Sequence, residues 1–220
     1  MVDTELLRHI PLFEGLDDAQ RALLAGACLR RRYPRGALVV QEGEQSDTLY
    51  LIIQGQVKVC RSTEDGREVV LSLLREGEHF GEMALLDAQP RSASVYTMTA
   101  SELGLIRKAD FERVLLDNPR LALAIMVSLC QRLRAADRSI ESLALMDVYG
   151  RVARLLLDLA VDTPDGGRLV RGPLTHRDIA QMVGASREMV TRILGDLARR
   201  GHIARHPDGI LLRDSLGERW

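Results

Sequence analysis

Residues 80–93 read FGEMALLDAQPRSA, a stretch in which a glycine, a carboxylate, a guanidinium and a hydroxyl lie close together in the sequence. Gly81 lets backbone N–H groups approach a ligand closely, and the Glu82 carboxylate can accept a hydrogen bond from a ribose hydroxyl. Further along, Arg91 and Ser92 supply a guanidinium and a hydroxyl suited to a phosphate. Any one of these residues is more often part of a surface turn with an ion pair. The ordered set is more specific than a single glycine-rich match and predicts a phosphate-binding loop.

Short runs with strand-like composition lie on both sides of this loop, between Arg30 and Arg107. The runs are Ala37–Val40, Leu49–Ile53, Gln56–Cys60, Val69–Leu73, Ser94–Met98 and Leu103–Ile106. Glycines punctuate them, and Asp65-Gly66 is a strong hairpin signal. We therefore expect a small antiparallel roll or barrel, preceded by a helix from about Asp17 to Ala27.

The apolar pattern changes after Asn118-Pro119 from a two-residue to a seven-residue period. One heptad position holds Ala122, Leu129, Ala136 and Leu143, and the other holds Met126, Leu133 and Ile140. Charged residues lie beside this seam: Arg132, Arg134, Asp137, Arg138 and Glu141. The pattern predicts one long helix and favours a parallel two-helix homodimer; the alternative is a helix packed only on its own domain.

A hinge and a second helix are expected next. Asp147 and Gly150 mark the hinge, and a leucine-rich helix follows from about Val148 to Val161. The cluster Thr163–Gly167 contains proline, aspartate and two glycines, which is typical of a turn. This turn separates the helix from a basic C-terminal module.

The C-terminal module has the pattern of a helix-turn-helix. Thr175 and Asp178 have capping-box spacing, so a short helix is expected to begin there. Ala180, Gly184 and Val190 follow the usual order of a small residue at the helix contact, glycine in the turn and a branched residue inside the second helix. Ser186 is a good N-cap for that second helix, which is expected to end near Arg200.

The second helix carries the residues expected to read DNA bases. Arg187, Glu188 and Arg192 lie in its N-terminal part, where arginine can donate to guanine and glutamate can accept from cytosine. A solvated charged face is the alternative, but Met189, Val190, Ile193, Leu194 and Leu197 already form the expected buried stripe. The other predicted DNA-binding residues in and beside the two helices are Thr175, His176 and Ser186.

A wing follows the second helix. His202–Arg205 and Ile210–Leu212 flank the turn Pro207-Asp208-Gly209, which predicts a hairpin and completes a winged helix-turn-helix. Arg205 or His206 is the expected phosphate contact, with no role in reading bases.

The charge distribution agrees with DNA binding by the C-terminal part alone. The 220-residue chain has a formal net charge of −1, but residues 1–147 sum to −4 and residues 148–220 to +3. No apolar run is long enough to cross a bilayer, and the N-terminus lacks the pattern of a secretion signal. We expect a cytoplasmic protein with no membrane contact.

Metal sites are not expected. Cys28, Cys60 and Cys130 are widely separated and form no CxxC pair, which argues against a disulfide framework, a zinc site or an iron–sulfur cluster. His79 could be a haem ligand by its position. A lone histidine beside a loop is more often a solvated or hydrogen-bonded side chain.

With these motifs the chain resembles the Crp-Fnr family of bacterial transcription regulators over essentially its whole length, and within it the cyclic-AMP receptor branch. The resemblance implies an α+β chain: a jelly-roll-like, cyclic-nucleotide-binding β-roll (residues 1–117), a dimerisation helix (118–146) and a winged helix-turn-helix (147–220). It also implies that Gly81 and Glu82 hold the ribose, and that Arg91, Ser92 and the Ala93 backbone hold the cyclic phosphate. Leu71 and Leu74 would line the base pocket.

The same resemblance implies the DNA target and the partners. Arg187, Glu188 and Arg192 match positions that read a TGTGA-type half-site, so a palindrome related to TGTGA-N6-TCACA is expected. Double-stranded DNA, a second copy of the chain and RNA polymerase are the expected partners. The iron–sulfur branch's N-terminal cysteine cluster is absent.

Ala136-Asp137 departs from the receptor branch, which usually has a threonine followed by serine or asparagine there, facing the adenine. Ala136 cannot hydrogen-bond a base, whereas Asp137 is an acceptor that matches the N1–H and amine of guanine. The expected effector is therefore a cyclic nucleotide: cyclic AMP, cyclic GMP or cyclic di-GMP. The alternative, equally weighted, is that Asp137 pairs with Arg134 or Arg138 on the helix surface.

Two other classes of function remain. The chain could be an effector-independent regulator with a vestigial nucleotide loop, whose activity depends on its abundance alone. An enzyme acting on cyclic nucleotides is disfavoured, because hydrolysis requires a metal cluster or a nucleophile with a base, and the loop offers a single carboxylate.

Overall fold

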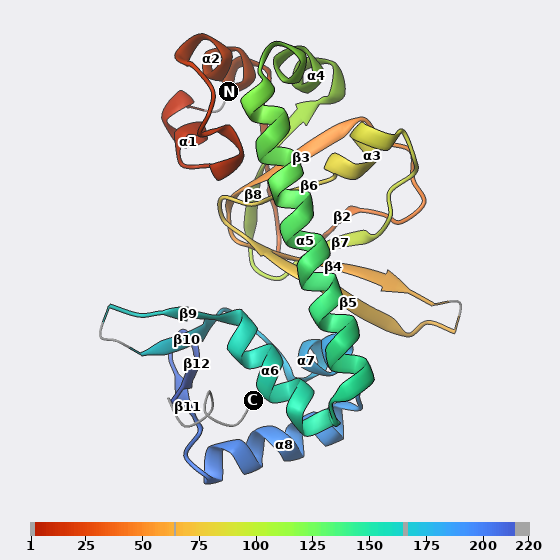
Figure 1. Cartoon of the computed structure of the whole chain (residues 1–220), viewed down its shortest axis with the longest axis vertical. Coiled ribbons are helices and arrows are strands. Elements are labelled where there is room, and N and C mark those ends of the chain that lie inside the picture. Colours follow the sequence, from red (N-terminus) through yellow and green to blue (C-terminus); the bar gives the residue numbers. More distant parts are fainter. Residues whose placement is uncertain (1–2, 64, 165–166, 214–220) are drawn as a thin grey trace. The chain divides into compact units, whose positions relative to one another are not determined.

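The computed structural model of the chain describes residues 3–63, 65–164 and 167–213 (Figure 1). The chain divides into two units, each with its own hydrophobic core. The first unit consists of Met1–Arg67 and Leu71–Leu133, and the second of Glu68–Val70 and Arg134–Trp220.

Two four-stranded antiparallel sheets form the roll. In spatial order the first sheet contains β1 (Leu29–Tyr33), β8 (Ser101–Arg107), β3 (Thr48–Gln54) and β6 (His79–Phe80). The second contains β2 (Leu38–Val40), β7 (Ser94–Thr97), β4 (Gln56–Ser62) and β5 (Glu68–Arg75). This arrangement confirms the antiparallel roll expected from the sequence.

The strand β3 is buried on both faces, and its two-residue period separates two cores. Leu49 and Leu51 belong to the cluster formed with the helices of this unit, whereas Tyr50 and Ile52 belong to the cluster inside the roll. The Phe80 ring of β6 stacks on Tyr50 with centroids 4.8 Å apart. Because neighbouring residues of a strand face opposite sides, His79 faces away from the roll interior.

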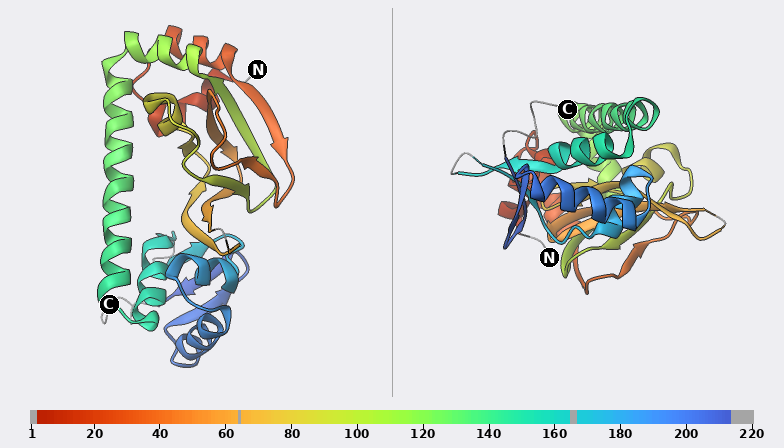
Figure 2. Two further views of the ribbon diagram at one scale, coloured as in Figure 1. Left: turned by 90° about the vertical axis from the view of Figure 1, so that its right-hand side faces the viewer. Right: turned by 90° about the horizontal axis from the view of Figure 1, so that it is seen from below.

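Helices cover the roll at one end and along one side. They are α1 (Thr4–Arg8), the 3-10 helix η1 (Pro11–Phe13), α2 (Asp18–Ala27), α3 (Glu82–Asp87), α4 (Lys108–Asp117) and the long α5 (Pro119–Leu145). In the first half of α5, Leu121 and Ile125 are buried in the helical core. Figure 2 shows α5 as one long, continuous helix. Among the described residues no single helix has the length and hydropathy of a membrane span; α4 and α5 reach them only together, across a bend of 111°.

The second unit contains the C-terminal module. Its helices are α6 (Val148–Leu159), α7 (His176–Val183) and α8 (Arg187–Arg199). Its antiparallel sheet has the spatial order β11 (Ile203–His206), β12 (Gly209–Leu212), β10 (Arg168–Arg171) and β9 (Ala160–Asp162). A core of buried aliphatic residues joins α6, α7 and α8, with Leu156, Ile179 and Leu197 fully buried. The helix-turn-helix and the wing are therefore present as predicted.

The predicted boundaries and burial need several corrections. The leucine-rich helix ends at Leu159 and not at Val161, because Ala160–Asp162 forms β9 and pairs with β10. Met189 is 38% exposed, so it lies outside the buried stripe of α8. Glu82–Asp87, expected to be loop, forms the helix α3. Part of the predicted turn at Thr163–Gly167 lies outside the described residues.

Candidate functional site

The predicted phosphate loop, residues 80–93, begins at the end of β6 and leads into α3. We refer to these residues as the cassette. Gly81 joins the two elements with φ +88°, a conformation that favours glycine. A Cβ at this position would also lie 2.5 Å from Arg91 Nη1 and 3.0 Å from the Thr48 carbonyl oxygen. Glycine is required here because Arg91 packs directly against the backbone of the loop.

Arg91 is directed into the roll and is only 4% exposed. Its Nη1 donates to the Gly81 carbonyl at 2.7 Å, and its Nη2 donates to Ser46 Oγ at 2.7 Å and to the Thr48 carbonyl. The guanidinium also lies 5.7 Å from the centre of the Tyr50 ring. Burial lowers the pKa of Arg91, while Tyr50 and Glu82 act in the opposite direction. Nε is also buried and has no partner among the described residues.

Glu82 is held by a helix residue that the sequence did not assign to the site. The carboxylate is 1% exposed, and its Oε1 accepts from Arg132 Nη1 of α5 at 2.7 Å. Arg132 Nη2 also donates to the His79 carbonyl. The second carboxylate oxygen, Oε2, is buried without a partner among the described residues. The sequence had placed Arg132 only among the charges beside the heptad seam, and no spacing rule connects it to Glu82.

His79 differs from the expectation for a histidine beside a loop. It is 6% exposed, and its Nε2 has no hydrogen-bond partner within the described part of the chain. Burial, with the positive charge of Arg132, lowers the pKa of His79 to about 4. The imidazole is therefore neutral at neutral pH and is neither solvated nor bonded through Nε2. No group of three or more metal-ligating side chains occurs in the residues that the structure describes.

The remaining predicted effector residues of the roll are only partly brought together. Ala93 is buried at the end of the cassette, whereas Ser92 is exposed, with Oγ 3.9 Å from Met83 Sδ. Leu74 is buried in the roll interior, but Leu71 is 54% exposed. Residues three apart on a strand face opposite sides, so Leu71 does not share the face of Leu74.

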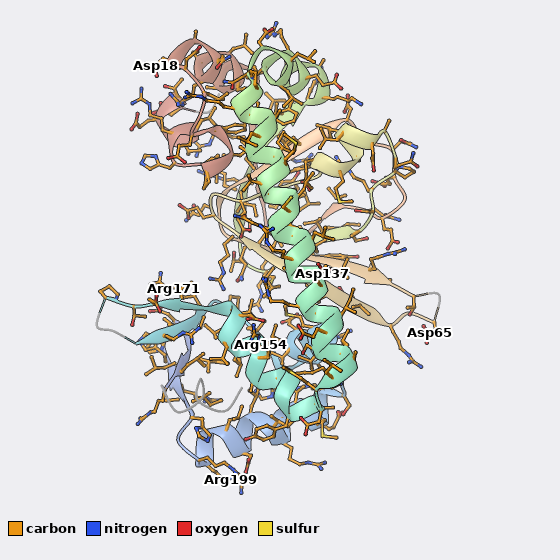
Figure 3. The ribbon with its side chains drawn as sticks, in the orientation of Figure 1. Asp18, Asp65, Asp137, Arg154, Arg171 and Arg199 are labelled. Atoms are coloured by element: carbon orange, nitrogen blue, oxygen red, sulfur yellow. The ribbon has the colours of Figure 1, made fainter. Side chains whose placement is uncertain are left out.

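Ala136 and Asp137 are exposed on α5 and belong to the second unit. Figure 3 labels Asp137 on this helix. Within the described chain, Asp137 forms no ion pair with Arg134 or Arg138. The surface pairing considered from the sequence is therefore not formed in this structure.

The helix-turn-helix has the local geometry that its sequence indicates. Thr175 and Asp178 form a reciprocal capping box at the start of α7, and Ser186 Oγ accepts from Met189 N at 3.1 Å at the start of α8. Gly184 ends α7 with φ 63°. The hydroxyls of Thr175 and Ser186 are thus occupied in capping.

The predicted base-reading side chains are exposed together. Arg187, Glu188 and Arg192 are solvent-accessible on the N-terminal half of α8, and none forms an ion pair within the described residues. Arg205 is exposed on β11 of the wing. His176 contacts a residue that the sequence did not single out: its Nδ1 lies 2.8 Å from Thr191 Oγ1.

Two family models match this chain, one over the roll and one over the C-terminal module. A cyclic nucleotide-binding domain matches residues 30–118, and a Crp-like helix-turn-helix domain matches residues 150–216. The first contains the cassette and the second contains α7, α8 and the wing.

Curated relatives cover nearly all of the chain. The CRP-like cAMP-activated global transcriptional regulator of Mycobacterium tuberculosis is 37% identical over 214 residues, 96% of each chain. The cAMP-activated global transcriptional regulator CRP of Escherichia coli is 35% identical over 191 residues, 84% of this chain and 90% of the other. These relatives are named as transcriptional regulators and not as enzymes.

Solved structures show the same fold. The c-di-GMP responsive global regulator CLP of Xanthomonas campestris superposes with a TM-score of 0.74 at 31% identity, over 89% of this chain and 99% of the other. The catabolite activator protein of Thermus thermophilus gives a TM-score of 0.55 at 34% identity, over 94% and 97%.

Arg132 is expected to stabilise the chain through Glu82. Arg132→Ala leaves a buried carboxylate without its cation, so we expect the free energy of unfolding to fall by about 1–3 kcal/mol. In a double-mutant cycle with Glu82→Gln, measured by urea denaturation, the coupling should be about 1 kcal/mol or more. Arg134→Ala, an exposed position on the same helix, is the matched control. Additive effects of the two substitutions would contradict the pairing.

His79 is expected to make stability depend on pH. Its pKa is about 4 in the folded chain and near 6.5 in the unfolded chain, so the unfolded state binds more protons between these values. The free energy of unfolding should therefore decrease as the pH falls from about 6.5 to about 4, by on the order of 2–3 kcal/mol. His79→Phe should remove this component in urea titrations across the range, and His9→Gln should retain it. Equal slopes in wild type and His79→Phe would refute the assignment.

Proposed function

The chain belongs to the Crp-Fnr family of transcription regulators, and from this membership we propose that it is a homodimeric, sequence-specific DNA-binding regulator controlled by a cyclic nucleotide. In this proposal residues 1–117 form the effector domain, 118–146 the dimerisation helix and 147–220 the DNA-binding domain. A regulator of chromosomal genes acts in the cytoplasm, with RNA polymerase as its protein partner.

The observation that carries the proposal is the pair of unsatisfied atoms in the cassette. Arg91 Nε and Glu82 Oε2 are both buried and have no hydrogen-bond partner among the described residues. A buried polar atom without a partner is costly, so a ligand that satisfies it gains affinity. A cyclic phosphate supplies the acceptor for Arg91 and a ribose hydroxyl supplies the donor for Glu82. The residues present therefore fit this class of effector.

The printed functions of the relatives support the same class. The Mycobacterium tuberculosis and Escherichia coli proteins are named as cAMP-activated, and the Xanthomonas campestris protein as c-di-GMP responsive. We therefore propose cyclic AMP or a guanine cyclic nucleotide as the effector.

Exposed apolar residues on α5 support the homodimer. Met126, Leu133 and Ile140 repeat every seven residues along the helix and are 54%, 63% and 65% exposed. A row of large apolar side chains at this spacing is stabilised when a second copy of the helix covers it. We propose that this row is the centre of the dimer interface.

The exposed side chains of α8 support base reading. Arg187 and Arg192 present guanidinium groups suited to guanine, and Glu188 presents an acceptor for the cytosine amine. Each copy would read one TGTGA-like half-site, and the palindrome would match the two-fold axis of the dimer. Arg205 of the wing would contact phosphate.

The proposal predicts a nucleotide-dependent gel shift. On a duplex containing the TGTGA palindrome, cyclic nucleotide should raise DNA affinity by about 5- to 150-fold, the usual range of allosteric coupling. Arg91→Ala should abolish this response and leave the nucleotide-free affinity unchanged. Because Arg91 is buried, Ser92→Ala serves as the milder variant, and it should weaken the response without lowering the melting temperature.

The same experiment separates the competing functions. Equal DNA affinity with and without nucleotide in the wild type would favour the effector-independent regulator. Absence of binding to any duplex would refute DNA binding itself.

The exposed carboxylate of Asp137 favours a guanine base as a second, finer candidate. Calorimetric titration with cyclic AMP, cyclic GMP and cyclic di-GMP should then give tighter binding of a guanine nucleotide, and Asp137→Ala should remove the preference. Glu141→Ala, an acidic residue one turn further along α5, is the matched control. Tight cyclic-AMP binding that is unaffected by Asp137→Ala would refute the guanine candidate.

A further inference from the structure

A contact between His176 and Thr191 joins the two helices of the helix-turn-helix. His176 is the first residue of α7, and Thr191 lies on α8 four residues after Arg187. His176 Nδ1 and Thr191 Oγ1 are 2.8 Å apart, and both residues are exposed. The contact lies where the first turn of α7 meets the N-terminal half of α8.

The hydrogen bonds of Thr191 favour one tautomer of His176. Thr191 Oγ1 donates to the Arg187 carbonyl at 2.9 Å. We assign the single hydroxyl hydrogen to this bond, so that Oγ1 accepts from His176 Nδ1. In this tautomer Nδ1 carries the hydrogen of the neutral ring, and Nε2 has a hydrogen only when the ring is cationic.

The orientation of the ring follows from the same bond. The two ring nitrogens point in roughly opposite directions. Because Nδ1 is hydrogen-bonded to Thr191 Oγ1, the Nε2 atom faces away from this hydroxyl. No described residue forms a hydrogen bond with it. In a helix-turn-helix the first helix crosses the DNA backbone, so an exposed group at the start of α7 is expected to meet phosphates. A neutral Nε2 offers a phosphate only a lone pair, whereas the imidazolium offers an N–H and a positive charge.

We infer that Thr191 positions His176 as a DNA-phosphate contact that takes up a proton from solvent when DNA binds. The inference rests on the proposed DNA-binding function and adds a pH-dependent contact to it. The phosphate favours the charged ring through its charge and through the new hydrogen bond. By linkage, DNA affinity then rises as the pH falls through the range in which histidine changes charge.

Other charged side chains lie on the helices that carry and contact His176. They are Arg177 and Asp178 on α7, and Arg187, Glu188 and Arg192 on α8. The Asp178 carboxylate accepts from Thr175 in the capping box. From α6, Arg151 bonds the Val183 carbonyl at the opposite end of α7. All of these groups remain in the variants below, so differences between variants isolate His176.

Proton uptake on DNA binding tests the inference directly. Wild-type protein with cyclic nucleotide is titrated with the TGTGA-palindrome duplex in two buffers of different ionisation enthalpy, at several pH values and constant salt. We expect uptake approaching one proton per half-site, and a loss of affinity of up to about tenfold per pH unit for each half-site as the pH rises. His176→Arg keeps a positive charge at all these pH values, so it should bind tightly with no uptake from this position.

Variants of Thr191 test the positioning role. Thr191→Val preserves the shape of the side chain but removes the hydroxyl, so it should reduce proton uptake. Thr191→Ser should restore it. His9→Gln, which removes a histidine of the first unit, should behave as wild type.

The possible outcomes separate this inference from the proposed function. Wild-type binding without proton uptake, or wild-type uptake in His176→Arg, would overturn it. Unchanged uptake in Thr191→Val would overturn the positioning role of Thr191. If wild-type protein bound no duplex at any pH, DNA binding itself would fail.

Discussion

The buried carboxylate of Glu82 is the constraint on which the proposed effector site depends. A charge at 1% exposure is tolerated only with a close counter-charge and hydrogen bonds, and Arg132 of α5 supplies both. The same guanidinium bonds the His79 carbonyl, so one side chain connects the long helix to the last residues before the loop. Any rearrangement of α5 against β6 must therefore move the partner of this carboxylate or leave it unpaired. The Glu82 carboxylate, which we propose contacts the ligand, is thereby bonded directly to the helix proposed to form the dimer.

The sequence predicted those parts of the fold that short-range chemistry determines. The capping box at Thr175, the glycine that ends α7 at Gly184 and the N-cap Ser186 act within a few residues, so their positions were predicted and found. Strand β1 was missed because LRRRY lacks alternating apolar residues; it lies at the edge of its sheet with its side chains mostly exposed. The helix α3 was missed because its six residues were read as part of a ligand loop.

The residue types of the candidate site could be predicted from the sequence, but their geometry could not. The cassette motif identified Glu82 and Arg91, yet the structure directs Arg91 onto Gly81, Ser46 and Thr48. Arg132 lies 50 positions from Glu82 along the chain, and Thr191 lies 15 positions from His176. No periodicity relates residues at such separations. Only the packing of one element on another brings them together, and that packing is set by cores such as the two faces of β3.

Both proposed sites use the same physical arrangement. One atom of a polar side chain is held by the protein, and a second atom of the same group is left for a ligand: Oε1 and Oε2 of Glu82, the Nη atoms and Nε of Arg91, and Nδ1 and Nε2 of His176. The held atom fixes the orientation of the group before the ligand arrives, which reduces the entropy lost on binding. The holding residues Arg132 and Thr191 therefore influence affinity through orientation, by contacts that need no ligand atom. This separates the residues that touch a ligand from those that determine how well it is bound.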